Sequence, residues 1–293
     1  MISMRSEKEM YELILNTAQK DARIQAVYMN GSRTNKNALK DIFQDYDIVY
    51  VVDETLSFIE DKIWIKNFGE ILYMQYPDEF PNCKSDKANC YGWLMQFTDG
   101  NRLDLHVVTP EYAKKDVLAD KLCQILLDKN NILPPIPTAT DEDRHIKKPT
   151  EAEYLAVCNE FWWCTNNLAK GLWRKEIPYV QDMTNFCVRK QLEKMLGFKI
   201  GLLTNFSVSI GKSGKYMYRW LTETEWQTYL ATYFGSNPEE AFKAIMTMCD
   251  LFEETALFVG SKLGYTYNLK EAKAARDFLE HVYNLPSDAT EIY

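Results

Sequence analysis

The spacing of hydrophobic residues changes near the middle of the chain and predicts two differently built halves. In the first half, short β-branched and aromatic runs predict strands at residues 24–29, 46–52, 71–76, 91–97 and 102–108. Between them, helical spacing and capping residues predict helices that begin after Ser6, run from Ser57 to Phe68, and begin after Thr109. The first half is therefore predicted to be a mixed β-sheet with helices packed on it.

Beyond residue 150 the apolar residues recur at helical spacing, with few strand signals, to about Tyr283. A capping-box pattern at residues 150–153 marks the start of this helical part. Four prolines lie in the polar stretch that precedes it, at positions 134, 135, 137 and 149. We therefore predict an α+β protein with a sheet domain at 1–133, a linker at 134–149 and a helical bundle domain at 150–293.

The strongest candidate chemistry lies where the strand at 46–52 begins. Side chains alternate across a strand, so Asp45 and Asp47 lie on one face, about 6.6 Å apart along the chain. Two neighbouring carboxylates repel each other and are normally tolerated only with a cation between them, and a divalent metal is the simplest such cation. The flexible turn Gly31-Ser32 precedes them and can approach a phosphate closely through its backbone.

A third carboxylate, Asp104, belongs to a predicted hairpin. Residues 98–101, Thr-Asp-Gly-Asn, separate two strand-like runs, and Asp-Gly between such runs is a strong hairpin signal. Asp104 would then lie on a strand able to pair beside the strand of Asp45 and Asp47. Three aspartates after a Gly-Ser turn form a hard-oxygen site suited to Mg²⁺ and a nucleoside triphosphate.

Composition narrows the partners. The chain has 293 residues, a formal net charge of −8 and seven scattered cysteines. The acidic balance disfavours a nucleic acid as partner and suits a cationic small molecule, because nucleic-acid binding relies on clustered Lys and Arg. No apolar run is long enough for a membrane span, no signal peptide is visible, and the cysteine pattern fits a reducing compartment. We expect a cytoplasmic protein without membrane contact, as a monomer or weak homodimer.

Several motifs, in their order and spacing, carry a family resemblance. The Gly-Ser turn, the Asp-x-Asp strand and the later Asp104 resemble the signature of polymerase-β-type nucleotidyltransferases. The chain from about residue 4 to about residue 270 more closely resembles the aminoglycoside 6-adenylyltransferases that modify streptomycin. The motifs that carry this are Gly31-Ser32-Arg33-Thr34-Asn35, Phe43 to Ile48, Asp99-Gly100-Asn101, Leu103-Asp104-Leu105, Asn159-Glu160-Phe161-Trp162 and Lys170-Gly171-Leu172.

The resemblance implies transfer of AMP from ATP to the 6-hydroxyl on the streptidine ring of streptomycin, with release of pyrophosphate and antibiotic resistance as the consequence. In this scheme Asp45 and Asp47 hold one Mg²⁺, and a second Mg²⁺ is shared with Asp104. Asp104 is also the expected general base, because it faces the acceptor. His106, two residues further on the same face, is expected to be a rim residue.

Residues around the nucleotide are expected from both halves. Gly31, Ser32 and Arg33 adjoin the phosphates, and a lysine among Lys170, Lys212 and Lys215 is expected to neutralise the triphosphate, with Lys212 the leading candidate because glycines flank its loop. Streptidine carries two guanidinium groups, which carboxylates bind well. The candidates for that contact are Glu160, Glu176 and Asp182, and Trp162 is a candidate beside them, although aromatic residues at helical spacing are more often core.

Two alternatives remain open. The same chemistry can serve a different acceptor, either another aminoglycoside or a protein hydroxyl. A non-catalytic nucleotide-binding or antitoxin-type module can keep the same fold, but such a module is expected to have lost part of its carboxylate set. All three aspartates are present here, which favours an enzyme.

Overall fold

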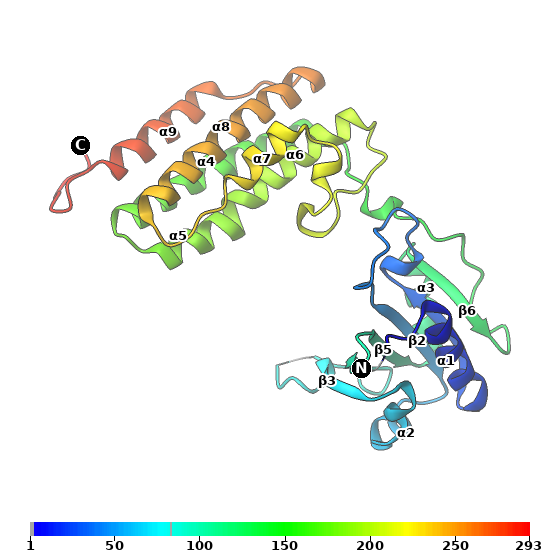
Figure 1. Cartoon of the computed structure of the whole chain (residues 1–293). Helices are drawn as coiled ribbons and strands as arrows, with labels where there is room; N and C mark the ends of the chain where they lie inside the picture. Colours follow the sequence, from blue (N-terminus) through cyan, green and yellow to red (C-terminus); the bar gives the residue numbers. More distant parts are fainter. Residues whose placement is uncertain (1–2, 83) are drawn as a thin grey trace. The chain divides into compact units, whose positions relative to one another are not determined.

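A computed structural model describes residues 3–82 and 84–293. The described residues form two compact units, which are divided between Asp143 and Arg144 (Figure 1). The division falls inside the predicted linker at 134–149. Residues just before it belong to the first unit, because Leu133 is buried against the sheet and Asp141 accepts hydrogen bonds from Asn35 and Asn37. Each unit is described here by itself.

The first unit is a mixed sheet whose six described strands lie in the order β3-β4-β5-β2-β1-β6. The pairs are antiparallel except β2 with β5, which run parallel. This puts the two central strands side by side with their amino-terminal ends at the same edge. The strands are β1 (Ile24–Asn30), β2 (Tyr46–Val52), β3 (Ile71–Gln75), β4 (Cys90–Phe97), β5 (Arg102–Val108) and β6 (Cys123–Asp128).

Helices cover both faces of this sheet. On one face α1 (Glu7–Lys20) and α2 (Leu56–Glu60) pack against alternate strand residues such as Ile48 and Tyr50. On the other face α3 (Pro110–Ala119) packs against Val49 and Val51. Because side chains alternate along β2, Asp47 belongs to the face of Val49 and Val51. The aspartates therefore lie on the α3 face, at the end that begins the strands.

The predicted strands and the capped first helix are confirmed within a residue or two. The predicted helix at 57–68 is wrong: the chain forms the short α2 and then a separate 3₁₀ turn, Trp64–Phe68. The break has a local cause, because the Asp61 carboxylate accepts hydrogen bonds from the backbone N–H groups of Ile63 and Trp64, both at 3.0 Å, and so starts a new turn. Strand β6 was not predicted.

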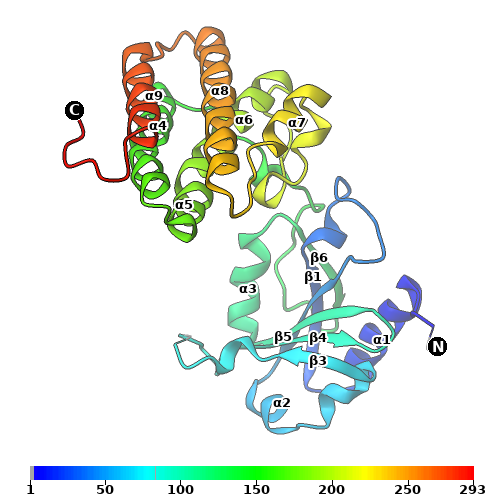
Figure 2. The same cartoon turned by 60° about the vertical axis from the view of Figure 1, so that its left-hand side comes forward.

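The second unit is a helical bundle, as expected. Its longest helices are α4 (Glu151–Trp173) and α8 (Pro238–Leu263). Helix α4 packs beside α9 (Leu269–Tyr283), and α8 packs beside α6 (Arg189–Leu203), as Figure 2 shows. The Thr150 capping box is present, and Phe161 stacks on Phe252 with ring centroids 3.7 Å apart in the core. The other helices are α5 (Ile177–Met183), α6 (Arg189–Leu203), α7 (Glu223–Leu230) and α9 (Leu269–Tyr283), with a π-helical turn at Thr184–Val188.

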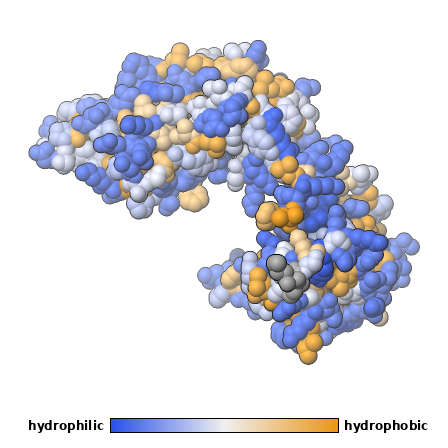
Figure 3. Space-filling model, viewed as in Figure 1, coloured by the Kyte–Doolittle hydropathy of each residue, from blue (hydrophilic) through white to orange (hydrophobic). Residues whose placement is uncertain are grey.

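The face drawn in Figure 3 is mostly hydrophilic, with apolar residues in small scattered patches. Within the described ranges, none of the helices combines the length and the apolar character that a membrane span requires. The predicted α+β class, a mixed sheet unit followed by a helical bundle, is confirmed.

Candidate active site

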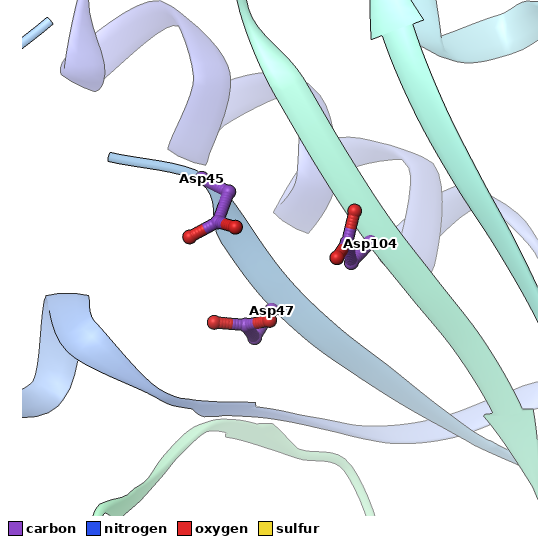
Figure 4. A group of neighbouring side chains, drawn as sticks. All are labelled: Asp45, Asp47 and Asp104. Atoms are coloured by element: carbon purple, nitrogen blue, oxygen red, sulfur yellow. The ribbon is translucent and has the colours of Figure 1, made fainter. Parts of the chain in front are cut away.

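Three aspartates converge at the edge where β2 and β5 begin (Figure 4). Asp47 lies opposite Asp104 in the parallel pairing of these strands, and Asp45 is the residue directly before β2. One carboxylate oxygen from each residue lies within 4.8 Å of the other two. The pairing of two parallel strands thus brings together side chains that are more than fifty residues apart in sequence.

Gly31 shapes the space next to Asp47. It precedes a short 3₁₀ turn, Ser32–Thr34, and has a φ of +77°, which residues with a side chain rarely adopt. A Cβ atom built on Gly31 would lie 2.9 Å from Asp47 Cγ and nearer still to Oδ2. The glycine is therefore required both by the backbone turn and by the close approach of the Asp47 carboxylate.

Arg33 fixes the segment that leads into β2. Its guanidinium donates to the backbone carbonyls of Asp45 at 2.9 Å and Gln44 at 2.7 Å, and it stacks on the Tyr46 ring at 3.6 Å. The side chain is only 9% exposed and also faces Glu7. These contacts turn the guanidinium toward the protein and hold the backbone of Asp45 in place. The predicted contact of Arg33 with the nucleotide stays a prediction.

The three carboxylates perturb one another. Burial, and then the charges of Asp45 and Asp104, raise the pKa of Asp47 to about 7. Arg102 contacts two of these carboxylates: its Nε and Nη2 donate to the two oxygens of Asp104 at 2.8 and 2.6 Å, and its Nε lies 3.8 Å from Asp45 Oδ2. The site is thus an acidic cluster with the Arg102 guanidinium at its edge.

The donor set fits a divalent metal ion of the magnesium type. Carboxylate oxygens are the ligands that Mg²⁺ prefers, and three of them converge within the span of one or two ions. Asn30 lies opposite Asp47 in the β1–β2 pairing, so its side chain leaves the sheet on the same face. Its Oδ1 is buried and accepts no hydrogen bond from any described residue. Such an atom is suited to a proton of a metal-bound water.

His106 lies beyond Asp104 on the same face, and its ring packs over Gly92 on the neighbouring strand. Burial lowers the pKa of His106, which keeps the imidazole neutral near pH 7. The rim role expected for His106 stays a prediction.

The lysines proposed for the triphosphate all belong to the second unit and are exposed. Lys212 and Lys215 lie in a loop where Gly211, Ser213 and Gly214 have positive φ, and Lys215 Nζ lies 5.1 Å from the Tyr216 ring centroid. Lys170, near the end of α4, lines a cavity of about 330 Å³ together with Trp173 and Arg174. Their role toward a nucleotide stays a prediction.

The candidate acceptor residues are also in the second unit. Glu160 and Asp182 are exposed, and Glu176 precedes α5 with Arg174 at 3.9 Å. Trp162 is 2% exposed, and its indole N–H donates to the Tyr267 hydroxyl at 2.8 Å. Trp162 is therefore a core residue, and little of its surface remains for a ligand.

Two residues of the site were missed from the sequence. Arg102 precedes Asp104 by two positions, so alternation along the strand places both on one face and was a usable signal. Asn30 gave no such signal, because its place opposite Asp47 depends on the register of β1 against β2.

A Gly-Ser turn followed by three aspartates at the start of two parallel central strands is the arrangement of a nucleotidyltransferase. The comparison with known sequences extends this: the chain belongs to the streptomycin adenylyltransferase family, whose model matches residues 4–282. The predicted family resemblance is confirmed, and the protein is an enzyme of the nucleotidyltransferase class.

Curated relatives agree over nearly their whole length. A Campylobacter jejuni protein named aminoglycoside 6-adenylyltransferase is 39% identical over 92% of this chain and 93% of its own. Proteins of the same name from Bacillus subtilis and Staphylococcus aureus are 37% and 32% identical, covering 90% and 96% of this chain and 93% and 99% of their own. A crystal structure of an aminoglycoside 6-adenyltransferase from Bacillus subtilis matches 96% of this chain and all of its own, at 31% identity with a TM-score of 0.48.

Proposed function

We propose that this enzyme transfers AMP from ATP to the 6-hydroxyl of the streptidine ring of streptomycin, with Mg²⁺ as cofactor and pyrophosphate as the leaving product. The observation that carries the proposal is the convergence of Asp45, Asp47 and Asp104 within 4.8 Å. The family membership supplies the acceptor class, since its curated members are named for aminoglycosides. Modification of the antibiotic would confer resistance.

The three aspartates divide two tasks in this reaction. Asp45 and Asp47 would hold the cation on the nucleotide side, and Asp104, on the neighbouring strand, accepts the proton of the attacking hydroxyl. When bound, Mg²⁺ supplies the positive charge that offsets the triphosphate and the departing pyrophosphate, and it acidifies the hydroxyl. Arg33 keeps the Asp45 backbone in register, and the Gly31-Ser32 turn offers backbone N–H groups to phosphate oxygens.

The acceptor is a polycation, and the chain's charge of −8 favours its approach. Exposed carboxylates of the helical unit, Glu160, Glu176 and Asp182, are the proposed partners of the streptidine guanidinium groups. ATP and a reducing compartment for the free thiols of the described cysteines both favour a cytoplasmic enzyme.

The test is a turnover assay with purified protein, ATP, Mg²⁺ and a panel of aminoglycosides. Streptomycin should release pyrophosphate and give a product heavier by one AMP, and NMR of that product should place the phosphodiester on the streptidine 6-oxygen. The Asp45→Asn variant is the matched negative control, because it removes one charge of the cluster and preserves the side-chain size.

Two outcomes would reject the proposal. Release of pyrophosphate with kanamycin but not with streptomycin would assign a different aminoglycoside to the same chemistry. Absence of release with every aminoglycoside, in protein that binds ATP and Mg²⁺, would favour a protein hydroxyl as acceptor or a non-catalytic module.

A further inference from the structure

Arg102 makes a contact that the proposed reaction does not use. Its guanidinium donates to both oxygens of Asp104, and its Nε also approaches Asp45 at 3.8 Å. The Asp104 side chain is 13% exposed, whereas that of Arg102 is 47% exposed, at the first residue of β5. The carboxylate is thus held in place, but the guanidinium has solvent on one side and room to move.

A divalent ion and this guanidinium compete for the same carboxylates. An ion held by one oxygen each from Asp45, Asp47 and Asp104 lies within a few ångströms of all three, and therefore close to the bound guanidinium. Two positive charges at such a distance repel each other strongly when water is partly excluded. Ion binding to the triad therefore weakens the Arg102–Asp104 pair, and the pair in turn weakens ion binding.

A nucleoside triphosphate relieves this competition. Its phosphate oxygens bring negative charge to the site, and a guanidinium binds phosphate through the same two-point geometry that it uses for a carboxylate. Arg102 is close enough to the triad to exchange one acidic partner for the other by rotating its side chain.

We propose that Arg102 is a transferable counter-ion: it pairs with Asp104 until a triphosphate enters with its divalent cation, and it then moves to the phosphate oxygens. This inference rests on the proposed function for the identity of the nucleotide. Its consequence is that Arg102 opposes binding of the cation alone and favours binding of the nucleotide, so that the two ligands are taken up together.

The experiment compares wild type with Arg102→Met, which keeps the side-chain length and removes the charge. Mn²⁺ binding without nucleotide is followed by the electron paramagnetic resonance signal of free Mn²⁺. Binding of α,β-methylene-ATP, which resists transfer, is followed by calorimetry at a saturating concentration of Mg²⁺. We expect Arg102→Met to bind Mn²⁺ about tenfold more tightly, and the nucleotide analogue at least about fivefold more weakly.

Arg23→Met is the matched control. Arg23 is also partly exposed and paired with an aspartate, Asp21, at 2.5 Å, but it precedes β1 and lies roughly 20 Å of strand away from Asn30. The Arg23→Met substitution removes the same charge from the same unit, and it should change the affinities for Mn²⁺ and for the nucleotide analogue by less than about twofold. Arg102→Lys keeps the charge but loses the two-point contact, so its Mn²⁺ affinity should lie between those of wild type and Arg102→Met.

Opposite shifts of the two ligands are the signature of the exchange. Weaker binding of both ligands to Arg102→Met would show a merely structural role, and unchanged Mn²⁺ affinity would show that the pair does not compete with the ion; either result overturns the inference. If Arg102→Met does not fold, the Mn²⁺ affinity of Arg102→Lys is the deciding measurement. An affinity equal to that of wild type would reject the inference that the two-point contact of Arg102 with Asp104 competes with the ion. The result is independent of turnover: opposite shifts in a protein that adenylylates no aminoglycoside would support Arg102's role and reject the proposed function.

Discussion

The carboxylate of Asp47 packs directly against Gly31 and occupies the space that a side chain on residue 31 would need. A Cβ on Gly31 would lie 2.9 Å from Asp47 Cγ, far inside van der Waals contact. From the sequence, this glycine was interpreted as a flexible turn residue that lets a phosphate approach the backbone closely. The structure adds a second reason, because the turn sets the position of a metal-ligand candidate.

Gly31→Ala should therefore damage the site beyond its cost to folding. The positive φ alone destabilises an alanine by about 1–2 kcal/mol. The displaced Asp47 should in addition lower turnover by about 100-fold, since small misplacements of reacting groups have effects of that size. Steady-state kinetics with ATP and streptomycin, together with Mn²⁺ titration, measure both effects.

Gly264→Ala is the matched control for this prediction. Gly264 ends α8 with the same φ of +77°, and a Cβ there would meet nothing within 4 Å. The two variants should lose similar stability in urea, but only Gly31→Ala should lose Mn²⁺ affinity. Equal turnover in both variants would show that Asp47 tolerates the added methyl group.

Arg33→Met should lower activity without removing a ligand contact. The guanidinium holds the carbonyls of Gln44 and Asp45, so its loss should loosen the Asp45 carboxylate. Supporting residues of metal sites typically change affinity or activity by about tenfold to 100-fold. We expect a loss of that size in turnover and Mn²⁺ affinity.

Arg23→Met separates this effect from general destabilisation. Arg23 also stacks on an aromatic ring, with its guanidinium 3.9 Å from the centroid of Phe58, and also pairs with an acid, but at the far end of β1. Its substitution should lower the unfolding midpoint in urea and leave the metal affinity unchanged. If the affinity of Arg33→Met for ATP falls while its Mn²⁺ affinity stays that of wild type, Arg33 contacts the nucleotide directly.

Strand periodicity and capping boxes were sufficient to predict much of the fold. The strands around Asp47 and Asp104 are β-branched runs with clear turn signals, and the sequence indicated that the two strands are able to pair, although not that they run parallel. The Ser6 and Thr150 boxes are local contacts that do not depend on the rest of the chain. These features are encoded within a few residues, so they can be predicted correctly without knowledge of the rest of the fold.

Other features depend on competition or on register and were not predicted. The helix after Ser57 ends early because Asp61 bonds to the following backbone, which outweighs the helical spacing of the apolar residues. Strand β6 follows α3 as a short apolar run that alone does not distinguish strand from helix. The contact between Arg102 and Asp104 requires side-chain directions, and the place of Asn30 requires the pairing of two strands.

The raised pKa of Asp47, about 7, predicts an unusual pH dependence of stability. A carboxyl group whose pKa is higher in the folded state contributes stability that is complete below its unfolded pKa, about 4, and is lost as the pH rises through about 7. In EDTA, the free energy of unfolding of Asp47→Asn, measured relative to that of wild type, should therefore rise by about 2 kcal/mol when the pH is raised from 5 to 8. Urea unfolding at the two pH values measures this gain.

Divalent cations and a control variant test the cause. Saturating Mn²⁺ at pH 8 should stabilise the wild type and not Asp47→Asn, because the charged carboxylate is then a ligand. Asp53 is an exposed aspartate at the other end of β2. Between the two pH values, the free energy of unfolding of Asp53→Asn should change by the same amount as that of wild type. The same result for Asp47→Asn would contradict the electrostatic account of the cluster.

Asp104→Asn should separate chemistry from nucleotide binding. The amide keeps the size of the side chain and one acceptor oxygen for Arg102, but it cannot take a proton from the attacking hydroxyl. Loss of a general base typically lowers turnover by about 100-fold to 10,000-fold. The dissociation constant of ATP with Mg²⁺ should change far less, because Asp45 and Asp47 still hold the cation.

Asp47→Asn is the comparison, since it should weaken ATP–Mg²⁺ binding itself. Turnover of Asp104→Asn within tenfold of wild type would move the base to another residue on this face, and His106 is the nearest candidate along β5.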